Sequence, residues 1–286
     1  RDVERSRGLG DVYKRQQYPE QSDLALERKL EEKYGLTEAL IAVPAYEQSS
    51  DQEVAFQAVD YILRVLKKNM VFGMTWGRAM HEFVEQLAKD ERLRSLSFQN
   101  VKVVPFLGTP GAIQSDSWNT TTYSNTLATK VGNLLHCASY NLSAPMYVEG
   151  TKEKELIESI DEIAKVLHMA ETADIALIGI GSMQDDSSII KAEIRTKEEY
   201  KELVRKGAVG EIVGRIYDKN GQTVDEDLKR KMVGISLDKI AKIPVRVGMS
   251  YGKDKIEAIK GAIAGGLVNV LVTCLLYTSP SPRDLS

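Results

Sequence analysis

Short apolar runs alternate with amphipathic helical segments along most of this 286-residue chain. Ala173–Ile178 is the most strand-like of the apolar runs, and Val54–Leu66 places its apolar side chains on one helix face. Strands that alternate with helices form a mostly parallel sheet with helices on both faces, so an α/β, Rossmann-like fold is predicted. The other predicted strands are 40–43, 101–107, 210–217, 232–235, 245–249 and 267–272, and the other predicted helices are 24–34, 126–135, 156–167, 196–206 and 255–264. Segment 142–148 is expected to be extended but broken by Pro145.

Glycine-rich turns follow four of the predicted strands. In Val71–Met80 a short apolar run leads through Gly73, Thr75 and Gly77 into a helix. Such a turn leaves backbone N–H groups and the positive end of the helix dipole facing an anion. Ligands of parallel sheets bind beyond the carboxyl ends of the strands. We therefore expect one binding site formed by the turns 73–77, 108–111, 179–182 and 248–252.

The first of these turns offers groups that suit a phosphate. The hydroxyl of Thr75 and the N–H of Gly77 could contact it, with Arg78 nearby. In the alternative interpretation the glycines only permit a tight turn. For Arg78 alone, a solvated helix residue is the favoured interpretation. The glycine spacing fits neither a Walker loop nor a dinucleotide fingerprint.

Three later features extend the predicted site. The turn Gly179–Ser182 either approaches a small ligand closely or is a plain turn, and it lacks the third glycine of the dinucleotide motif, so no nucleotide cofactor is predicted. Lys255 opens the last predicted helix, where a cation opposes the helix dipole. Pairing with a ligand anion would explain this placement, and a surface lysine beside Asp254 is the alternative. Glu211 either accepts sugar hydroxyls or is an exposed strand carboxylate.

Composition and the remaining reactive residues point away from catalysis. The formal net charge is −3 and there are two cysteines, so neither a basic nucleic-acid surface nor a disulfide framework is expected, and no zinc spacing occurs. No apolar run reaches the ~20 residues of a membrane span, and a cytoplasmic protein without metal, cofactor or enzyme activity is predicted. The residues considered and set aside, for want of partners, are His81, His136, His168, Asp185, Asp186 and Cys137.

The two ends of the chain read as complementary DNA. Asp11–Gln16 and Cys274–Ser279 can be back-translated into reverse complements, and the complementarity continues through Ser6–Gly10 and Pro280–Asp284. This DNA resembles a transposase-type sequencing adapter, and a real disordered tail is the alternative. We therefore expect residues 1–16 and 274–286 to be translated adapter, and 17–273 to be a domain truncated at both ends.

Eight short motifs occur in order across nearly all of residues 17–273. They are Gly73–Arg78, Val103–Gly108, Ala144-Pro145, Ala173–Ser182, Gly207–Glu211, Gly234–Ser236, Lys255–Ile259 and Gly265–Thr273. Together they resemble the effector (sugar-binding) domain of SorC/DeoR-type bacterial transcriptional regulators. Each motif is weak alone, and their order makes the resemblance specific.

The resemblance implies a fold similar to that of the glucosamine-6-phosphate deaminase, ribose-5-phosphate isomerase and CoA-transferase group. It also implies binding of a phosphorylated sugar that changes affinity for operator DNA, usually in a tetramer. By position, the phosphate would lie near Thr75 and Gly77, with Lys255 approaching from the last helix. The other implied ligand contacts are Trp76, Arg78, Gly108, Thr109, Gly111, Gly179, Gly181, Ser182 and Glu211.

The chain departs from the family pattern at several places. The family carries an N-terminal helix-turn-helix, and here the adapter-like segment stands where it is expected. The threonine-aspartate that usually follows the last strand stops at Thr273. Thr109 and Pro110 intervene where many relatives have a further glycine, which puts the ligand contacts of Gly108–Gly111 in question.

These observations favour a phosphosugar-sensing effector domain that controls DNA binding by a missing helix-turn-helix, in a homo-oligomer without membrane contact. One alternative is a sugar-phosphate isomerase or deaminase of the same fold, which requires a positioned general base. The other is an oligomerisation module whose glycine turns are purely structural. Turnover of a sugar phosphate would favour the enzyme, and a stable oligomer that binds no phosphosugar would favour the module.

Overall fold

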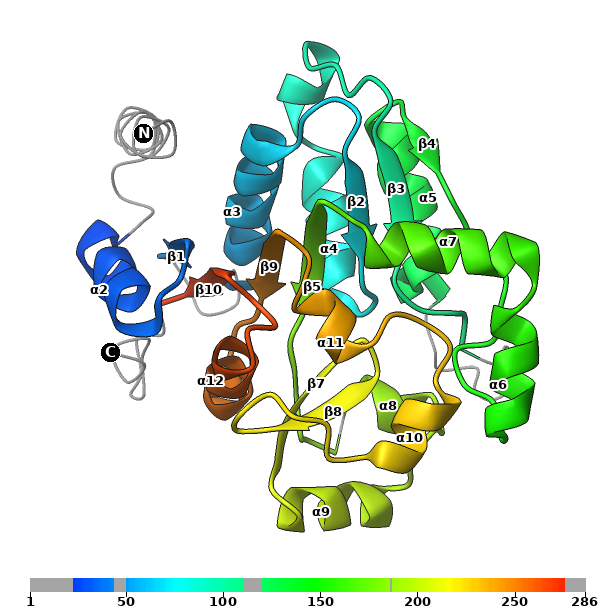
Figure 1. The fold of residues 1–286 in the computed structure, drawn as a ribbon. Coiled ribbons are helices and arrows are strands. Elements are labelled where there is room, and N and C mark those ends of the chain that lie inside the picture. Colours follow the sequence, from blue (N-terminus) through cyan, green and yellow to red (C-terminus); the bar gives the residue numbers. More distant parts are fainter. Residues whose placement is uncertain (1–22, 44–49, 111–119, 186, 276–286) are drawn as a thin grey trace.

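A seven-stranded sheet forms the centre of the protein, in a computed structural model that describes residues 23–43, 50–110, 120–185 and 187–275. All its strand pairs are parallel, and the order is β1-β10-β9-β5-β2-β3-β4 (Figure 1). This confirms the predicted parallel sheet. The strands are β1 (Glu38–Ala42), β2 (Val71–Met74), β3 (Lys102–Pro105), β4 (Ala138–Ser139), β5 (Ile175–Gly179), β9 (Val245–Met249) and β10 (Val270–Cys274).

Both faces of the sheet are buried, because successive strand residues point to opposite sides. Ile175 and Leu177 of β5 belong to one hydrophobic core, whereas Ala176 and Ile178 belong to the other. The first core contains α3 (Ser50–Val65), α4 (Arg78–Leu87) and α5 (Ser124–Leu134), and the second contains α2 (Leu24–Tyr34), α7 (Asp161–Glu171), α9 (Lys197–Arg205), α11 (Leu237–Ile240) and α12 (Ile256–Ala264). Helices therefore cover both faces, as predicted.

A small antiparallel sheet lies beside the large one, below it in Figure 1. It consists of β6 (Gly181–Ser182), β7 (Ala208–Ile212) and β8 (Arg215–Asp218). The single strand predicted over 210–217 is wrong, because the chain reverses at Val213 and Gly214. Their φ angles of 54° and 68° are those of a two-residue hairpin turn. A valine in that conformation gives no turn signal in the sequence.

The helix predicted over 156–167 is instead two helices. α6 (Thr151–Glu158) ends where the Ser159 hydroxyl donates to the carbonyl of Leu156, and Ile160 adopts an extended conformation before α7 begins. Segment 232–235 is not the strand that was predicted, and segment 142–148 forms no regular strand, in keeping with the predicted break at Pro145. They form isolated bridges with each other and with the turn after β3, and Pro145 has no N–H to donate to a ladder.

Helix α2 protects the outer edge of the large sheet. The N–H groups of Ala39 and Ile41 in edge strand β1 donate to the carboxylates of Glu31 and Glu27, each at 2.9 Å. An edge strand whose N–H groups are occupied cannot recruit another strand. The remaining helices among the described residues are η2 (Glu91–Arg94), η3 (Thr120–Thr122), α8 (Ser188–Lys191), α10 (Glu226–Lys231) and η4 (Lys253–Lys255).

Two helix ends have the residues that commonly cap helices. Gly35 ends α2 in the left-handed conformation, and Thr196 with Glu199 forms a capping box at the start of α9.

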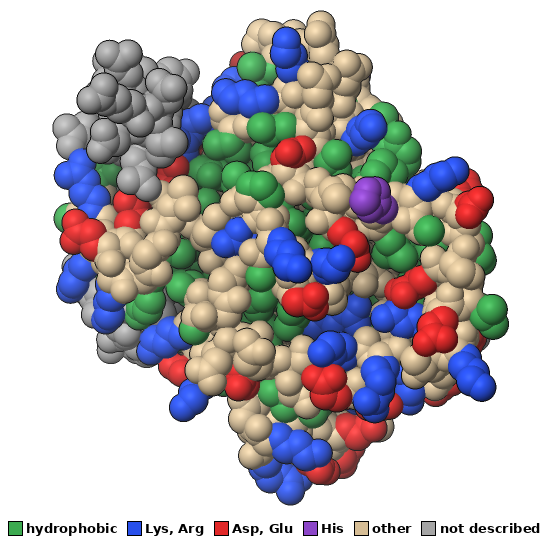
Figure 2. Space-filling model, in the orientation of Figure 1, with side chains coloured by type: hydrophobic (Ala, Val, Ile, Leu, Met, Phe, Trp, Pro, Cys, Tyr) green, Lys and Arg blue, Asp and Glu red, His purple; other side chains and the backbone are tan. Residues whose placement is uncertain are grey.

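Figure 2 shows basic and acidic side chains interspersed over one face of the molecule. Cys274, which the sequence assigns to the terminal segment, is the buried last residue of β10 and pairs with Ala42.

Candidate functional site

The four glycine-rich turns follow four adjacent strands. The strands before them, β9, β5, β2 and β3, are neighbours in the sheet. Because these strands are parallel, their carboxyl ends meet along one border of the sheet, here termed the carboxyl edge. The described parts of the predicted turns therefore lie together. Gly111 lies outside the described residues.

Thr75 joins two of these turns. It follows β2 and is buried, and its hydroxyl accepts a hydrogen bond from the N–H of Gly179 at 3.0 Å. Its own N–H donates to the carbonyl of Leu177 at 3.1 Å. The hydroxyl proton of Thr75 remains to be donated, because the bond from Gly179 uses only an oxygen lone pair. Thr75 thus has the chemistry to contact an anion.

Gly77 allows the backbone turn that leads into α4. It precedes α4 with a φ of 102° and without a side-chain cap on that helix. Its N–H donates to the carbonyl of Thr122 at 3.0 Å, so this predicted phosphate donor is already paired within the protein. The N–H groups available at the start of α4 come from the first turn beyond Gly77. Arg78, the first of these residues, is exposed and acts electrostatically on Tyr251.

Glu211 is a buried carboxyl beside Trp76. It lies on β7, where one carboxylate oxygen accepts from the N–H of Gly214, and the Trp76 side chain donates a second hydrogen bond. A Cβ atom at Gly181 would lie 2.8 Å from the other oxygen, so glycine is needed there for close packing. Burial raises the pKa of Glu211 to about 7, although Gly214, Lys255 and Trp76 oppose the rise.

Lys255 has anionic and polar partners at the same place. Its ammonium donates to the hydroxyl of Ser182 at 3.0 Å and lies 3.6 Å from a carboxylate oxygen of Asp254. Ser182 is buried and is also hydrogen-bonded to Asp254. Ser182, Glu211, Asp254 and Lys255 are called the Lys255 group below. The structure places Lys255 in η4, immediately before α12, and not within the helix as predicted.

Gly108 and Thr109 have structural partners. The N–H of Gly108 donates to Val233 at 3.1 Å, and that of Thr109 donates to Ala144 at 2.9 Å. A Cβ atom at Gly108 would lie 2.5 Å from the carbonyl oxygen of Ala144. The Thr109 hydroxyl accepts from Asn125 at 2.8 Å. These contacts fasten the turn after β3 to segments 142–148 and 232–235, so both N–H groups are already occupied.

The raised pKa of Glu211 predicts a pH dependence of stability. Between pH 4.5, where an ordinary glutamate titrates, and about pH 7, the folded chain holds a proton that the unfolded chain has released. This contribution is therefore complete below pH 4.5 and is lost as the pH rises through 7, by at most about 3 kcal/mol. Urea unfolding should show that the difference in free energy of unfolding between the wild type and Glu211→Gln changes between pH 4.5 and about pH 7. Parallel pH profiles would contradict the assignment.

Of the residues set aside in the sequence, His81 lies in the first turn of α4, and its Nδ1 is buried without a hydrogen-bond partner among the described residues. His136 and His168 are exposed, and burial raises the pKa of the Cys137 thiol to about 11, which keeps it protonated. Asp185 is exposed, and Asp186 lies outside the described residues. Among the described residues no group of acidic, histidine and cysteine side chains could hold a metal ion, and no helix is long and apolar enough to cross a membrane.

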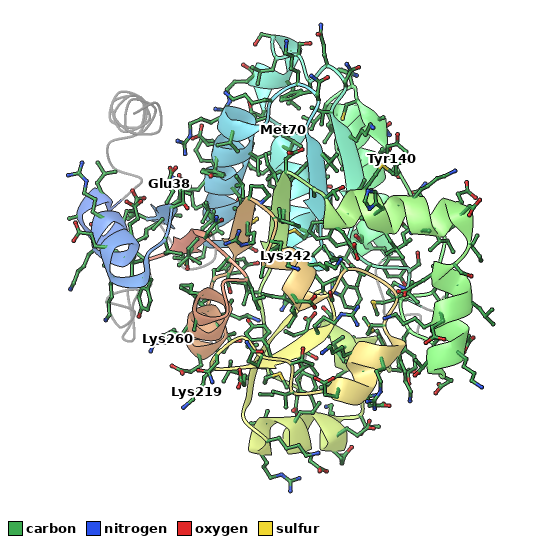
Figure 3. All side chains as sticks on the ribbon, viewed as in Figure 1. Glu38, Met70, Tyr140, Lys219, Lys242 and Lys260 are labelled. Atoms are coloured by element: carbon green, nitrogen blue, oxygen red, sulfur yellow. The ribbon has the colours of Figure 1, made fainter. Side chains whose placement is uncertain are left out.

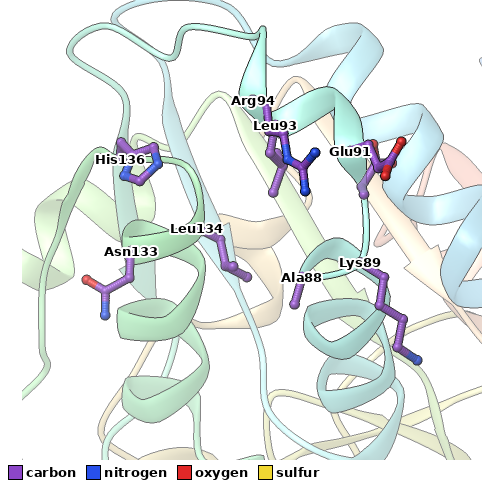
Figure 4. A pocket seen from close by; sticks show the side chains of 9 residues that line it. Ala88, Lys89, Glu91, Leu93, Arg94, Asn133, Leu134 and His136 are labelled. Atoms are coloured by element: carbon purple, nitrogen blue, oxygen red, sulfur yellow. The ribbon is translucent and has the colours of Figure 1, made fainter.

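A separate hollow of about 330 Å³ lies between the C-terminal ends of α4 and α5. Figure 4 shows Asn133, Leu134 and His136 on one side of it and Lys89 and Arg94 on the other. Since α4 starts at the carboxyl edge and runs back along the sheet for ten residues, about 15 Å, the hollow lies at the opposite end. It is therefore distinct from the Lys255 group.

Little in the sequence signals the roles of two residues, one in the Lys255 group and one in the structure that supports it. Asp254 reads as an ordinary surface partner of the adjacent lysine, but it also bonds Ser182, 72 residues away. Arg215 lies in the apolar stretch 212–217 and is almost fully buried. A charged residue inside such a stretch is the signal that could have identified it.

Known proteins share this fold and resemble the chain in sequence. A family model of a sugar-binding domain matches residues 18–274. The sorbitol operon regulator of Klebsiella pneumoniae is 28% identical over 275 residues, which are 95% of this chain and 84% of that protein. The solved full-length regulator SorC from the same organism has a TM-score of 0.78 and 27% identity, over 90% of this chain and 80% of that one.

A second solved relative has a similar fold and identity. The DeoR family transcriptional regulator from Listeria monocytogenes has a TM-score of 0.75 and 26% identity, over 88% of this chain and 96% of that one. The family match spans most of the chain, and the relatives are transcriptional regulators. The chain belongs to the sugar-binding domain family of SorC/DeoR-type transcriptional regulators.

Proposed function

We propose that this domain binds a phosphorylated sugar at the carboxyl edge and that binding controls how a DNA-binding segment of the same protein holds its operator. The observation that supports this most is the Lys255 group, in which a partly buried ammonium lies beside a buried serine hydroxyl and a buried carboxyl. An ammonium and hydroxyl donors suit a phosphate, and a carboxyl suits sugar hydroxyls.

Within this proposal the site residues take different parts. Thr75, Ser182 and Lys255 contact the phosphate, together with N–H groups at the start of α4, and Trp76 and Glu211 face the sugar. The glycines of the site have a structural part, which is to allow close packing of the backbone around it. They are Gly77, Gly108, Gly179 and Gly181, where the N–H group is paired within the protein or a Cβ atom would collide with a neighbour. Arg78 adds positive charge from the exposed surface. The sugar shifts the population between two arrangements of a homotetramer by its differential affinity.

The proposed partners are thus a phosphosugar effector and operator DNA, in the cytoplasm where the chromosome lies. No catalytic role is assigned. Burial raises the pKa of Glu211 to about 7, the value that a general base needs. An isomerase or deaminase would use it, and turnover of ribose 5-phosphate or glucosamine 6-phosphate by the purified chain would replace the sensory role by an enzymatic one.

Isothermal calorimetry tests the proposal with sugars in matched pairs, each phosphate beside its unphosphorylated parent. We expect at least one phosphosugar to bind with a dissociation constant in the micromolar range, about −8 kcal/mol, and its parent to bind at least about a hundredfold more weakly. Light scattering of the same samples reports the oligomeric state. Equal affinity for both members of every pair would contradict a phosphate site.

A further inference from the structure

Lys255 already has an anionic neighbour in the structure. One carboxylate oxygen of Asp254 lies 3.6 Å from the Lys255 ammonium, and the same oxygen is hydrogen-bonded to the hydroxyl of Ser182. Lys255 itself donates to that hydroxyl at 3.0 Å. The carboxylate oxygen therefore has the two partners that an oxygen of a bound phosphate would use at this place.

The Asp254 carboxylate and a bound phosphate would repel each other if both lay beside Lys255. Lys255 acts electrostatically on Glu211 as well as pairing with Asp254, so one ammonium serves two carboxyl groups before any ligand arrives. A phosphate dianion beside Lys255 would bring up to two more negative charges within a few ångströms of Asp254. Like charges at such distances cost several kcal/mol at the effective dielectric of a protein surface. One carboxylate must therefore leave or be neutralised.

The two carboxyl groups differ in their freedom to move. Glu211 is buried, packed against Gly181 and held by Gly214 and Trp76, and its raised pKa shows that it accepts a proton readily in place. The Asp254 side chain is 42% exposed and belongs to the short helix η4. Its other oxygen lies over Gly252, where a Cβ atom would come within 2.8 Å of it. Asp254 is thus the group that can swing into solvent.

We propose that Asp254 is an internal stand-in for the anionic group of the ligand: it occupies the place beside Ser182 and Lys255 in the ligand-free domain, and the arriving phosphate displaces it. The inference rests on the proposed phosphosugar site and adds to it a competitor within the chain. Affinity for phosphate is lowered by this competition. The contacts of η4 differ between the empty and the filled site, which is what a ligand needs to shift a conformational equilibrium.

The displaced segment leads directly into a helix that supports the site. α12 begins one residue after η4, and the carbonyl of Ala258 in α12 accepts from the hydroxyl of Tyr217 at 2.8 Å. Tyr217 lies on β8, next to the strand that carries Glu211. Release of Asp254 therefore acts on an element that packs against the Glu211 strand.

Calorimetry of the full chain with inorganic phosphate, and with a phosphosugar that the wild type binds, tests the proposal. Asp254→Asn keeps an oxygen for Ser182 but removes the charge, so we expect it to bind both probes about tenfold more tightly. Glu257→Gln is the matched control, because Glu257 carries the same charge on the first turn of α12, is 67% exposed and pairs with Lys260. The control should change affinity less than about twofold. An unphosphorylated sugar should show no gain with either variant.

The outcomes separate this proposal from the function on which it rests. Tighter binding by Asp254→Asn alone supports displacement. Unchanged or weaker binding by Asp254→Asn overturns it, the latter by making Asp254 a ligand contact, while the wild-type affinity for the phosphosugar still stands. An equal gain in both variants reduces the effect to general surface charge and also overturns it. Binding of neither probe by any of the three proteins overturns both proposals.

Discussion

Replacing Lys255 by methionine is expected to weaken phosphosugar binding at least about a hundredfold, nearly 3 kcal/mol, while the melting temperature changes little. The ammonium is the cation that pairs with Ser182 and Asp254, and methionine keeps the length and apolar stem of the side chain without its charge. The Lys255 side chain is 22% exposed, so methionine at this position creates no fully buried cavity. Calorimetry measures the affinity and differential scanning calorimetry the melting temperature.

A second lysine on the same helix provides the control. Lys260, which Figure 3 labels on α12, pairs with Glu257 on the surface. Lys260→Met removes the same charge from the same helix and should leave binding within about twofold of the wild type. An unchanged affinity in Lys255→Met would remove Lys255 from the site. A large fall in melting temperature would instead show that the lysine is needed for folding.

Replacing Arg215 by methionine is expected to lower the free energy of unfolding by about 4 kcal/mol. Arg215 is 3% exposed on β8, and its guanidinium donates to the carbonyls of Met232 at 3.2 Å and Gly234 at 3.0 Å. It also reaches Lys229 and Ile235. Methionine would leave these carbonyls without donors in the protein interior. Burial lowers the pKa of Arg215 to about 10, with Glu158 and Asp238 opposing the fall.

The effect should extend to the carboxyl edge. Segment 232–235, which Arg215 holds, accepts from Gly108 through the carbonyl of Val233, and the N–H of Ile235 donates to the carbonyl of Phe106 at 2.9 Å. Urea unfolding measures the loss, and Arg230→Met, an exposed change in the neighbouring helix α10, should cost less than about 0.5 kcal/mol. A loss of less than 1 kcal/mol in Arg215→Met would contradict a structural role for the buried charge.

The sheet and its helices could be predicted because each side chain reports its own environment. Ile175–Ile178 is apolar at successive positions since both faces of β5 are covered. The order of strands is less visible in a sequence. It follows from crossover connections, and it is what brings the turns after β9, β5, β2 and β3 to the same edge.

The site was predicted more completely in its residues than in their roles. Ser182, Glu211 and Lys255 were expected in one site, and the fold brings Ser182 and Lys255 into hydrogen-bond contact across 73 residues of chain. Gly77 and Gly108 were expected to offer N–H groups, but the structure pairs these with Thr122 and Val233. A sequence shows that a glycine is present, whereas its partners depend on segments far away in the chain.

The hairpin between β7 and β8 shows the limit most clearly. Val213 adopts a positive φ that β-branched residues rarely take, so the turn falls where propensity indicates a strand. Asn220-Gly221, a common turn signal, instead marks the following turn, where the N–H of Gly221 donates to the carbonyl of Asp218 at 2.9 Å. The N–H of Gly214 donates to the Glu211 carboxylate within the same hairpin, and this local bond holds the earlier turn in place.

A crystal structure of the chain with a bound phosphosugar tests the central claim most directly. We expect the phosphate at the carboxyl edge, with oxygens within hydrogen-bond distance of the Lys255 ammonium and the Ser182 hydroxyl, and Asp254 turned away from both. A phosphosugar bound in the hollow between α4 and α5, or bound with its phosphate remote from Lys255, would contradict the account.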